Sequence, residues 1–246
     1  VEMIFRMGSA SIFNPSEASM TCNLLREGTK SRTAEEINNQ LDYHGSFLDI
    51  KSGLDYTTIT LFGRSEFIPK LIPLLSEILL EPAFNSDALA KHKQRTIQNL
   101  EISQKKTSYW SVRMLRQSIF GTSHPYSRVP SSEKIDAISK SALEEYHKIL
   151  VKSFDAVLIS GSFDQELFDS LMNHHFGEIK LASQIDSKEA PVFNNNTLER
   201  KLEDTSQASI AIGSKAINIK SEDYPVHSFI VKILGGYFGS RLMKTL

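Results

Sequence analysis

The residues that could bind a metal or attack a substrate are few and widely separated in this sequence. No histidine has a second His or a Glu at a spacing used by zinc sites. His174 and Glu178 stand four residues apart, which is typical of a solvated helix end, and His44 precedes Gly45 where a helix C-terminus favours a cation. The seven histidines are His44, His92, His124, His147, His174, His175 and His227.

Motifs for nucleophilic and phosphate chemistry are also missing. The one cysteine, Cys22, falls on an expected helix, where a lone buried Cys is more often a small apolar residue than a thiolate. The sequence has no Gly-x-Ser-x-Gly elbow, and the glycines at 235–239 do not continue into a Lys-Ser/Thr phosphate loop. The basic residues between 91 and 106 lack interleaved aromatics, which indicates a solvated helix face.

Composition excludes several classes of protein. The chain has 246 residues, 28 Lys+Arg, 29 Asp+Glu, a formal net charge of −1 and 40% hydrophobic residues. This charge supplies no global field for nucleic acid or an anionic membrane. One cysteine cannot form an internal disulfide, and no apolar run reaches the ~20 residues that span a bilayer. We expect a soluble cytoplasmic or periplasmic protein with no nucleic-acid partner and no membrane span, its compartment undecided.

Strand and helix patterns are mixed along the chain rather than strictly alternating, which predicts an α+β fold. The residues 154–160 form a near-continuous apolar run, typical of a buried central strand. Thr33 to Glu36 and Ser141 to Glu144 are interpreted as capping boxes that open helices. Strands are expected at 1–6, 46–51, 55–62, 154–160, 178–181, 198–202 and 206–212, and helices at 17–26, 34–44, 67–79, 85–103, 107–120, 141–150, 163–176 and 224–234.

A polar stretch divides the chain into two parts of unequal length. The residues 184–197 form the best linker, which separates a first domain at 1–183 from residues 198–246. The sequence opens at Val1 inside an expected strand and stops at Leu246 inside an expected helix. We therefore expect a piece of a longer protein.

Several segments, in this order, resemble the insulinase/pitrilysin-type metallopeptidases, a family that includes the mitochondrial processing peptidases. They are Leu24–Ile37, Asp42–Gly45, Asp55–Thr57, Glu81–Phe84, Phe120–Tyr126, Phe176–Gly177 and Leu234–Leu242. They cover nearly the whole chain, and the last is most similar to bacterial members of the short, two-domain type. The resemblance implies a processing-peptidase-like first domain, with a mixed, mostly antiparallel sheet and helices packed on one face. Residues 198–246 would begin a second, truncated copy.

The zinc motif of this family, His-x-x-Glu-His on the first helix, is absent. Two histidines and a distal glutamate bind the metal there, and the glutamate of the motif activates water. Aligning the resemblance places Ser19 and Asn23 at the histidine positions, Cys22 at the position of the base and Asn99 at the distal ligand, with Glu101 the nearest acid. The resemblance thus implies no catalytic residue and no metal in this chain, and zinc only in a partner.

Two functions suit a member without zinc. The first is a non-catalytic subunit that pairs with a homologous zinc-containing subunit and helps to bind extended peptides in a shared chamber. In relatives that process targeting peptides, a Gly-rich loop of the inactive subunit contacts substrate, although such glycines equally suit a helix end and a turn. The matching residues are Gly235, Gly236, Tyr237, Phe238, Gly239, Ser240 and Arg241.

The second function is a structural or assembly protein of the same fold with no role in proteolysis. In active halves of the family, an Arg–Tyr pair follows the Ser-Arg-Leu segment. Its presence beyond Leu246 would favour the peptidase subunit, and its absence would favour the scaffold. A hydrolase that uses Cys22 as nucleophile is a weaker third hypothesis.

Overall fold

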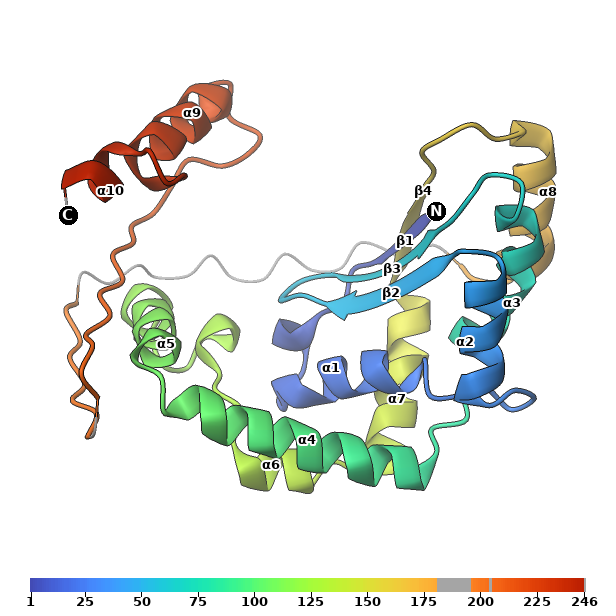
Figure 1. Cartoon of the computed structure of the whole chain (residues 1–246), viewed down its shortest axis with the longest axis horizontal. Helices are drawn as coiled ribbons and strands as arrows, with labels where there is room; N and C mark the ends of the chain where they lie inside the picture. Colours follow the sequence, from blue (N-terminus) through green and yellow to red (C-terminus); the bar gives the residue numbers. More distant parts are fainter. Residues whose placement is uncertain (181–195, 204, 246) are drawn as a thin grey trace.

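The computed structural model describes residues 1–180, 196–203 and 205–245, so most of the expected linker lies outside the described residues (Figure 1). The described elements, in chain order, are β1 (Glu2–Phe5), η1 (Ser9–Ser11), α1 (Pro15–Leu24), α2 (Ala34–Tyr43), β2 (Phe47–Ser52), β3 (Thr57–Phe62), α3 (Ile68–Leu80), α4 (Ser86–Gln104), α5 (Thr107–Phe120), η2 (Pro125–Ser127), α6 (Ser132–Asp136), α7 (Lys140–Lys152), β4 (Phe154–Leu158), α8 (Gln165–Phe176), α9 (Tyr224–Gly235) and α10 (Arg241–Thr245). None of these helices is long and apolar enough to cross a membrane.

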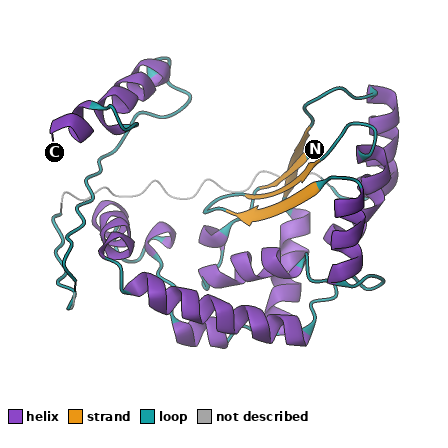
Figure 2. Ribbon diagram, in the orientation of Figure 1, coloured by secondary structure: helices purple, strands orange, loops and turns teal. Residues whose placement is uncertain are grey.

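The sheet is antiparallel and has the order β2-β3-β1-β4. Alternate residues of β1, β2 and β3 face the helices and are buried, such as Met3 and Phe5 on β1 and Ile59 and Leu61 on β3. Their neighbours on the opposite face are only partly covered. Figure 2 shows the helices between α1 and α8 gathered below and at one end of the sheet, with α9 and α10 apart from it. The α+β fold with helices packed on one face is therefore confirmed.

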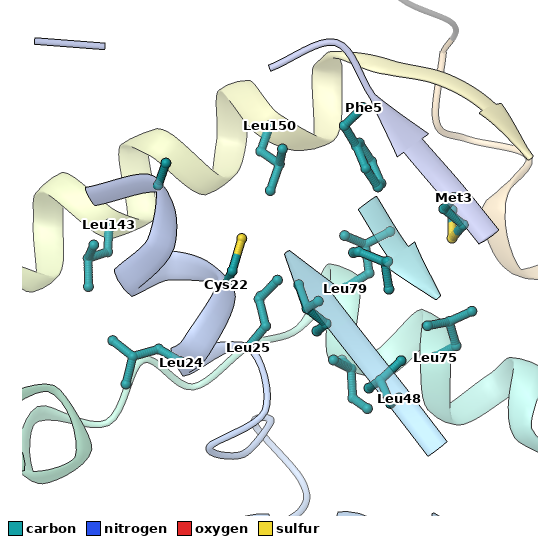
Figure 3. Packing of buried hydrophobic residues seen from close by; sticks show 14 of the residues in the cluster. Met3, Phe5, Cys22, Leu24, Leu25, Leu48, Leu75, Leu79, Leu143 and Leu150 are labelled. Carbon is teal, nitrogen blue, oxygen red and sulfur yellow. The ribbon is translucent and has the colours of Figure 1, made fainter. Parts of the chain in front are cut away.

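One hydrophobic core joins the sheet to helices α1, α3 and α7. Figure 3 shows Cys22 among its leucines, including Leu25, Leu79 and Leu150. Leu25 and Leu150 have no exposed surface. Each such fully buried side chain contributes about 1.5–3 kcal/mol relative to exposure, so α1 is held in place chiefly by its apolar inner face.

Hydroxyl caps set the starts of two helices, one as expected and one displaced. At α2, Thr33 accepts a hydrogen bond from the Glu36 N–H, and the Glu36 carboxylate accepts one from the Thr33 N–H, which confirms the first capping box. At α7 the second expectation is wrong. Ser139 is the N-cap and accepts from the Ala142 N–H, while the Ser141 hydroxyl hydrogen-bonds that of Ser139. Ser139 has the extended backbone conformation that is typical of an N-cap residue, and the helix begins directly after it.

Strand β4 lies at an edge, so the expected central position is wrong. Within the described residues it pairs only with β1, and Leu158 is 53% exposed. The apolar run instead reflects packing at its start, where the rings of Phe154 and Phe5 lie 5.7 Å apart. An apolar run reports burial, and it does not report how many neighbouring strands a segment has.

Three further expected strands are not formed where the chain is described. The residues after α8 turn instead of extending, and 198–202 and 206–212 have no strand partner among the described residues. Ile210 and Ile212 are 87% and 92% exposed. A strand needs a ladder partner for its backbone groups, and neither segment forms a ladder with any described residue.

The segment 196–213, with residue 204 outside the description, instead runs along α5. The Ser118 hydroxyl donates to the Asn196 carbonyl at one end of α5, and Thr107 and Ser209 hydroxyls lie 2.8 Å apart at the other. Between them the Arg200 guanidinium lies 3.5 Å from the centroid of the Trp110 ring. These contacts attach the chain leading to α9 and α10 to the first domain (Figure 1).

Candidate functional site

Helix α1 carries three of the four positions aligned with the zinc motif. Asn14 caps it by accepting from the Ser16 N–H, and Pro15 suits its first turn. The helix ends at Leu24, two residues before the expected end. Ser19 and Asn23, four residues apart, lie on one exposed face. Cys22 faces the core and is 2% exposed, so the three positions do not share one environment.

A pocket of about 700 Å³ lies between α1 and the β2–β3 hairpin. Its size falls within the usual range for ligand sites, roughly 300–1,000 Å³. All three α1 positions line it, although only Ser19 and Asn23 are exposed. The lining residues are Ser19, Cys22, Asn23, Ile50, Lys51, Ser52, Gly53, Leu54, Asp55, Tyr56 and Thr58.

The Cys22 thiol cannot replace the glutamate that activates water in the zinc motif. Burial raises its pKa to about 12, because a thiolate loses its hydration inside the core. A thiol with this pKa is protonated at neutral pH, whereas nucleophilic attack and metal binding both need the thiolate. The structure therefore agrees with the interpretation of Cys22 as a small apolar packing residue.

The hairpin wall of the pocket is held by the chain just after β1. The Ser9 N–H donates to the Gly53 carbonyl, and the Ala10 N–H donates to the Leu54 carbonyl, both at 2.9 Å. Gly8 makes this approach possible, since a Cβ atom there would lie 2.5 Å from the Leu54 oxygen. A side chain at position 8 would push the hairpin away from its place beside the pocket.

A second contact holds the hairpin from the side of α5. The Tyr126 hydroxyl donates to the Asp55 carboxylate at 2.6 Å. Burial and this hydrogen bond raise the pKa of Tyr126 to about 12. Tyr126 also packs edge-on against Phe120 and His124, with ring centroids 5.3 and 4.8 Å away. This cluster joins the end of α5 to the rim of the pocket.

Sequence reasoning missed this wall. The sequence predicted a strand beginning at Asp55 but gave no signal for its contact with Tyr126, which spans 71 residues of sequence. Gly8 gave a local signal as a glycine directly after a strand, but its close approach depends on where the hairpin lies.

Helix α4 carries both candidates for the distal position, Asn99 and Glu101. Asn99 lies seven residues, or two turns, after His92 and so on the same helix face. The His92 ring contacts the Glu27 carboxylate, just after α1, at 2.8 Å. Glu101 is about 200° further round the helix than Asn99, and it lines a different pocket, of about 480 Å³, beside Asp136 of α6. The face of Asn99 is the one turned toward α1, although Asn99 does not line the α1 pocket.

These residues do not fit a zinc ion. A serine hydroxyl and two asparagine amides are poor ligands for Zn²⁺, which takes Cys thiolate, His nitrogen or carboxylate oxygen, and Cys22 is held as a thiol. In the described part of the chain, no group of three or more His, Cys, Asp or Glu is arranged to hold a metal. No step through zinc is therefore derived for this chain.

The Gly-rich residues 235–241 form the junction of α9 and α10. Gly235 ends α9, Gly236 is its C-cap with φ −85°, and neither has the positive φ that only glycine adopts easily. A Cβ at Gly236 would lie 2.7 Å from the Cα of Lys232, and one at Gly239 would lie 2.9 Å from the Tyr237 ring. These glycines act through close packing in a helix–helix turn.

The other members of the segment 235–241 do not share one environment. Phe238 is 90% exposed, Ser240 is buried, and Arg241 begins α10. None of the seven lines the α1 pocket.

The antiparallel sheet with helices packed on one face is a fold that this chain shares with solved structures of peptidase M16 proteins. The model of a family described as peptidase M16 inactive domain matches residues 137–246. A solved structure of a peptidase M16 inactive domain from Pseudomonas fluorescens superposes with a TM-score of 0.79 at 21% identity, covering 99% of this chain and 61% of that chain.

Two curated relatives match all or most of this chain. The chain is 25% identical over 259 residues to the non-peptidase homolog YmxG of Helicobacter pylori, covering all of this chain and 58% of the relative. It is 21% identical over 222 residues to the uncharacterized zinc protease YmxG of Bacillus subtilis, covering 89% and 53%. The chain thus spans little more than half the length of these relatives. Together, the comparisons confirm the resemblance to the pitrilysin-type (M16) peptidases, and specifically to an inactive member.

Proposed function

We propose that this chain is a non-catalytic peptidase-family subunit that pairs with a homologous zinc-bearing subunit and helps to bind peptide substrate in a shared chamber. The observation that carries the proposal is the pocket beside α1. Hydrogen bonds hold its hairpin wall in place, while the aligned zinc ligands are replaced by a hydroxyl and two amides and the aligned base is a buried thiol. The pocket therefore suits binding without hydrolysis.

The position of β2 supports an extended peptide as the ligand. Among the described strands, β2 pairs only with β3, so its other edge has unpaired backbone groups. An extended peptide can add to such an edge through main-chain hydrogen bonds. The last residues of β2, Ile50 to Ser52, line the pocket, so a peptide on this edge would pass the exposed face of α1.

The partner and the cofactor follow from the same proposal. Hydrolysis needs a metal-activated water, and the residues here do not fit the metal. The proposed complex therefore has its zinc in the other subunit, and this chain contributes part of the chamber wall. The α9–α10 junction, with Gly235 to Arg241, is a second proposed contact for peptide.

Metal analysis and peptide cleavage test this function together. The chain alone, a zinc-bearing homologue from the same genome alone, and the mixture would be assayed for zinc and for cleavage of a fluorescence-quenched peptide library. We expect less than about 0.1 zinc per chain, in contrast to the filled site of an active member, and cleavage that needs both proteins. Stoichiometric zinc in this chain would overturn the proposal. Stable pairing that leaves cleavage unchanged would also contradict it, and would favour the structural or assembly role.

A further inference from the structure

Two side chains on the exposed face of α1 offer hydrogen bonds to a ligand in the pocket. The Asn23 amide carries one acceptor and two donor hydrogens, and within the described residues it makes no hydrogen bond. The Ser19 hydroxyl donates to the Ser16 carbonyl at 3.1 Å, which leaves its oxygen able to accept. Both residues line the pocket, one helical turn apart.

Each of the two charged side chains that line the pocket has a partner in the chain. The Lys51 ammonium pairs with the Asp49 carboxylate, and Asp55 accepts the hydrogen bond from Tyr126. The rest of the lining is uncharged, comprising backbone, apolar atoms, hydroxyls, the Asn23 amide and a protonated thiol. Moving a charged side chain from water into such a site is unfavourable without a partner charge, so the pocket favours uncharged side chains.

A peptide on the edge of β2 would place its backbone in reach of α1, because residues of both elements line the same pocket. A carboxamide matches a peptide group, since its N–H can donate to a carbonyl while its oxygen accepts from an N–H. A histidine bound to zinc could not make this pair of contacts. The substitution at position 23 therefore replaces a metal ligand by a group suited to a peptide backbone.

We propose that Asn23, assisted by Ser19, hydrogen-bonds the backbone of an extended peptide beside β2, and that the peptide side chain entering the pocket is uncharged. This inference rests on the proposed function, and it adds the class of peptide and the residues that hold it. Two of the three positions aligned with zinc ligands, 19 and 23, thereby become peptide-binding residues of the subunit.

Fluorescence polarisation with labelled hexapeptide pools provides the test. The pools have blocked ends and one central position fixed as Leu, Ser, Lys or Glu. We expect the Leu and Ser pools to bind more tightly than the Lys and Glu pools. Asn23→Ala should weaken binding of the better pool about tenfold, the effect expected from losing one or two hydrogen bonds. Asn23→Asp, which keeps the shape and loses the donor, should bind at least as poorly.

Two matched variants control for general effects of losing an asparagine. Asn39→Ala removes an exposed asparagine from α2, outside the pocket, and Asn99→Ala removes the other amide at an aligned zinc position, which does not line the pocket. Both should bind like the parent chain. Asn23 is exposed, so its variants should keep the parent melting temperature, which separates lost binding from lost folding.

The outcomes distinguish this inference from the function on which it rests. If the parent chain binds peptides and Asn23→Ala binds them equally well, the inference is wrong and the proposed function stands. A preference for the Lys or Glu pool would contradict the uncharged class. If the parent chain binds no pool and does not promote cleavage by its partner, both proposals fail.

Discussion

The α1 pocket and the α9–α10 junction are two surfaces proposed for peptide contact, and they differ in how they are supported. The pocket stands on α1, whose inner face is buried in the core, and its hairpin wall is held by Gly8 and by Tyr126. Helices α9 and α10 bury no residue, except that Ser240 beside them is covered. A preorganised site loses little entropy on binding, so the pocket is the better-prepared surface.

The two regions also differ in what their glycines contribute to the structure. Gly8 brings two segments of the first domain together, whereas Gly236 and Gly239 only close a turn between neighbouring helices. The glycine-rich segment 235–239 is conspicuous in the sequence, yet the glycine that shapes the pocket is the isolated Gly8. The following predictions test this contrast, from the largest expected effect to the smallest.

Restoring the four zinc positions should give the largest change. In the variant Ser19→His, Cys22→Glu, Asn23→His and Asn99→Glu, we expect zinc content to rise to about one per chain, because the four side chains then match a catalytic site. Elemental analysis after dialysis would measure it. The buried carboxylate at position 22 should also lower the stability of the metal-free variant.

The matched control keeps Asn99 and changes only positions 19, 22 and 23. Glu101 is then the nearest acid, and it faces α6, so this triple variant should bind zinc much more weakly than the quadruple one. Equal binding would show that Glu101 reaches the site. A folded quadruple variant that binds no zinc would show that α1 and α4 are no longer placed for a metal.

The reactivity of Cys22 should differ greatly between the folded and unfolded chain. At pH 8, a rise of its pKa from 9.0 to about 12 lowers the thiolate fraction about a thousandfold, and burial slows access further. Labelling by a disulfide reagent, with and without urea, would measure the ratio.

The pH dependence of this thiol has a definite sign. Its pKa is raised on folding, so its contribution to stability is complete below pH 9.0 and is lost as the pH rises toward 12. Cys22→Ala should lessen this loss in urea titrations between these values. Rapid labelling of the native chain at pH 8 would contradict the packing role and revive the cysteine-hydrolase hypothesis.

Gly8→Ala compares the two regions directly. The added methyl would meet the Leu54 carbonyl at 2.5 Å, and overpacking of this kind costs about 1–3 kcal/mol. Urea unfolding should show that loss. Gly236→Ala, also crowded but in a part with no buried helix face, should change the free energy of unfolding by less than about 0.5 kcal/mol. Similar losses for both would remove the distinction between the regions.

Local patterns predicted most helices and strands of residues 1–180, because these elements depend on neighbouring residues. The cap at Thr33, the β2–β3 pair and the burial of Cys22 follow from short spacings and residue types. The edge position of β4 and the contact between Asp55 and Tyr126 do not, since each depends on residues far along the chain. The alignment also left open which faces of α4 carry Asn99 and Glu101, and the structure places them about 200° apart.

Arg200 stacks on Trp110, so the fluorescence of this tryptophan can report on their contact. The chain has a single tryptophan, and it lies where the segment leading to α9 touches α5. Its emission therefore reports whether that segment is docked, with no label attached. A change in this emission on adding peptide or partner would report a change around Trp110, which Arg200, Tyr109 and the Gln104 carbonyl contact.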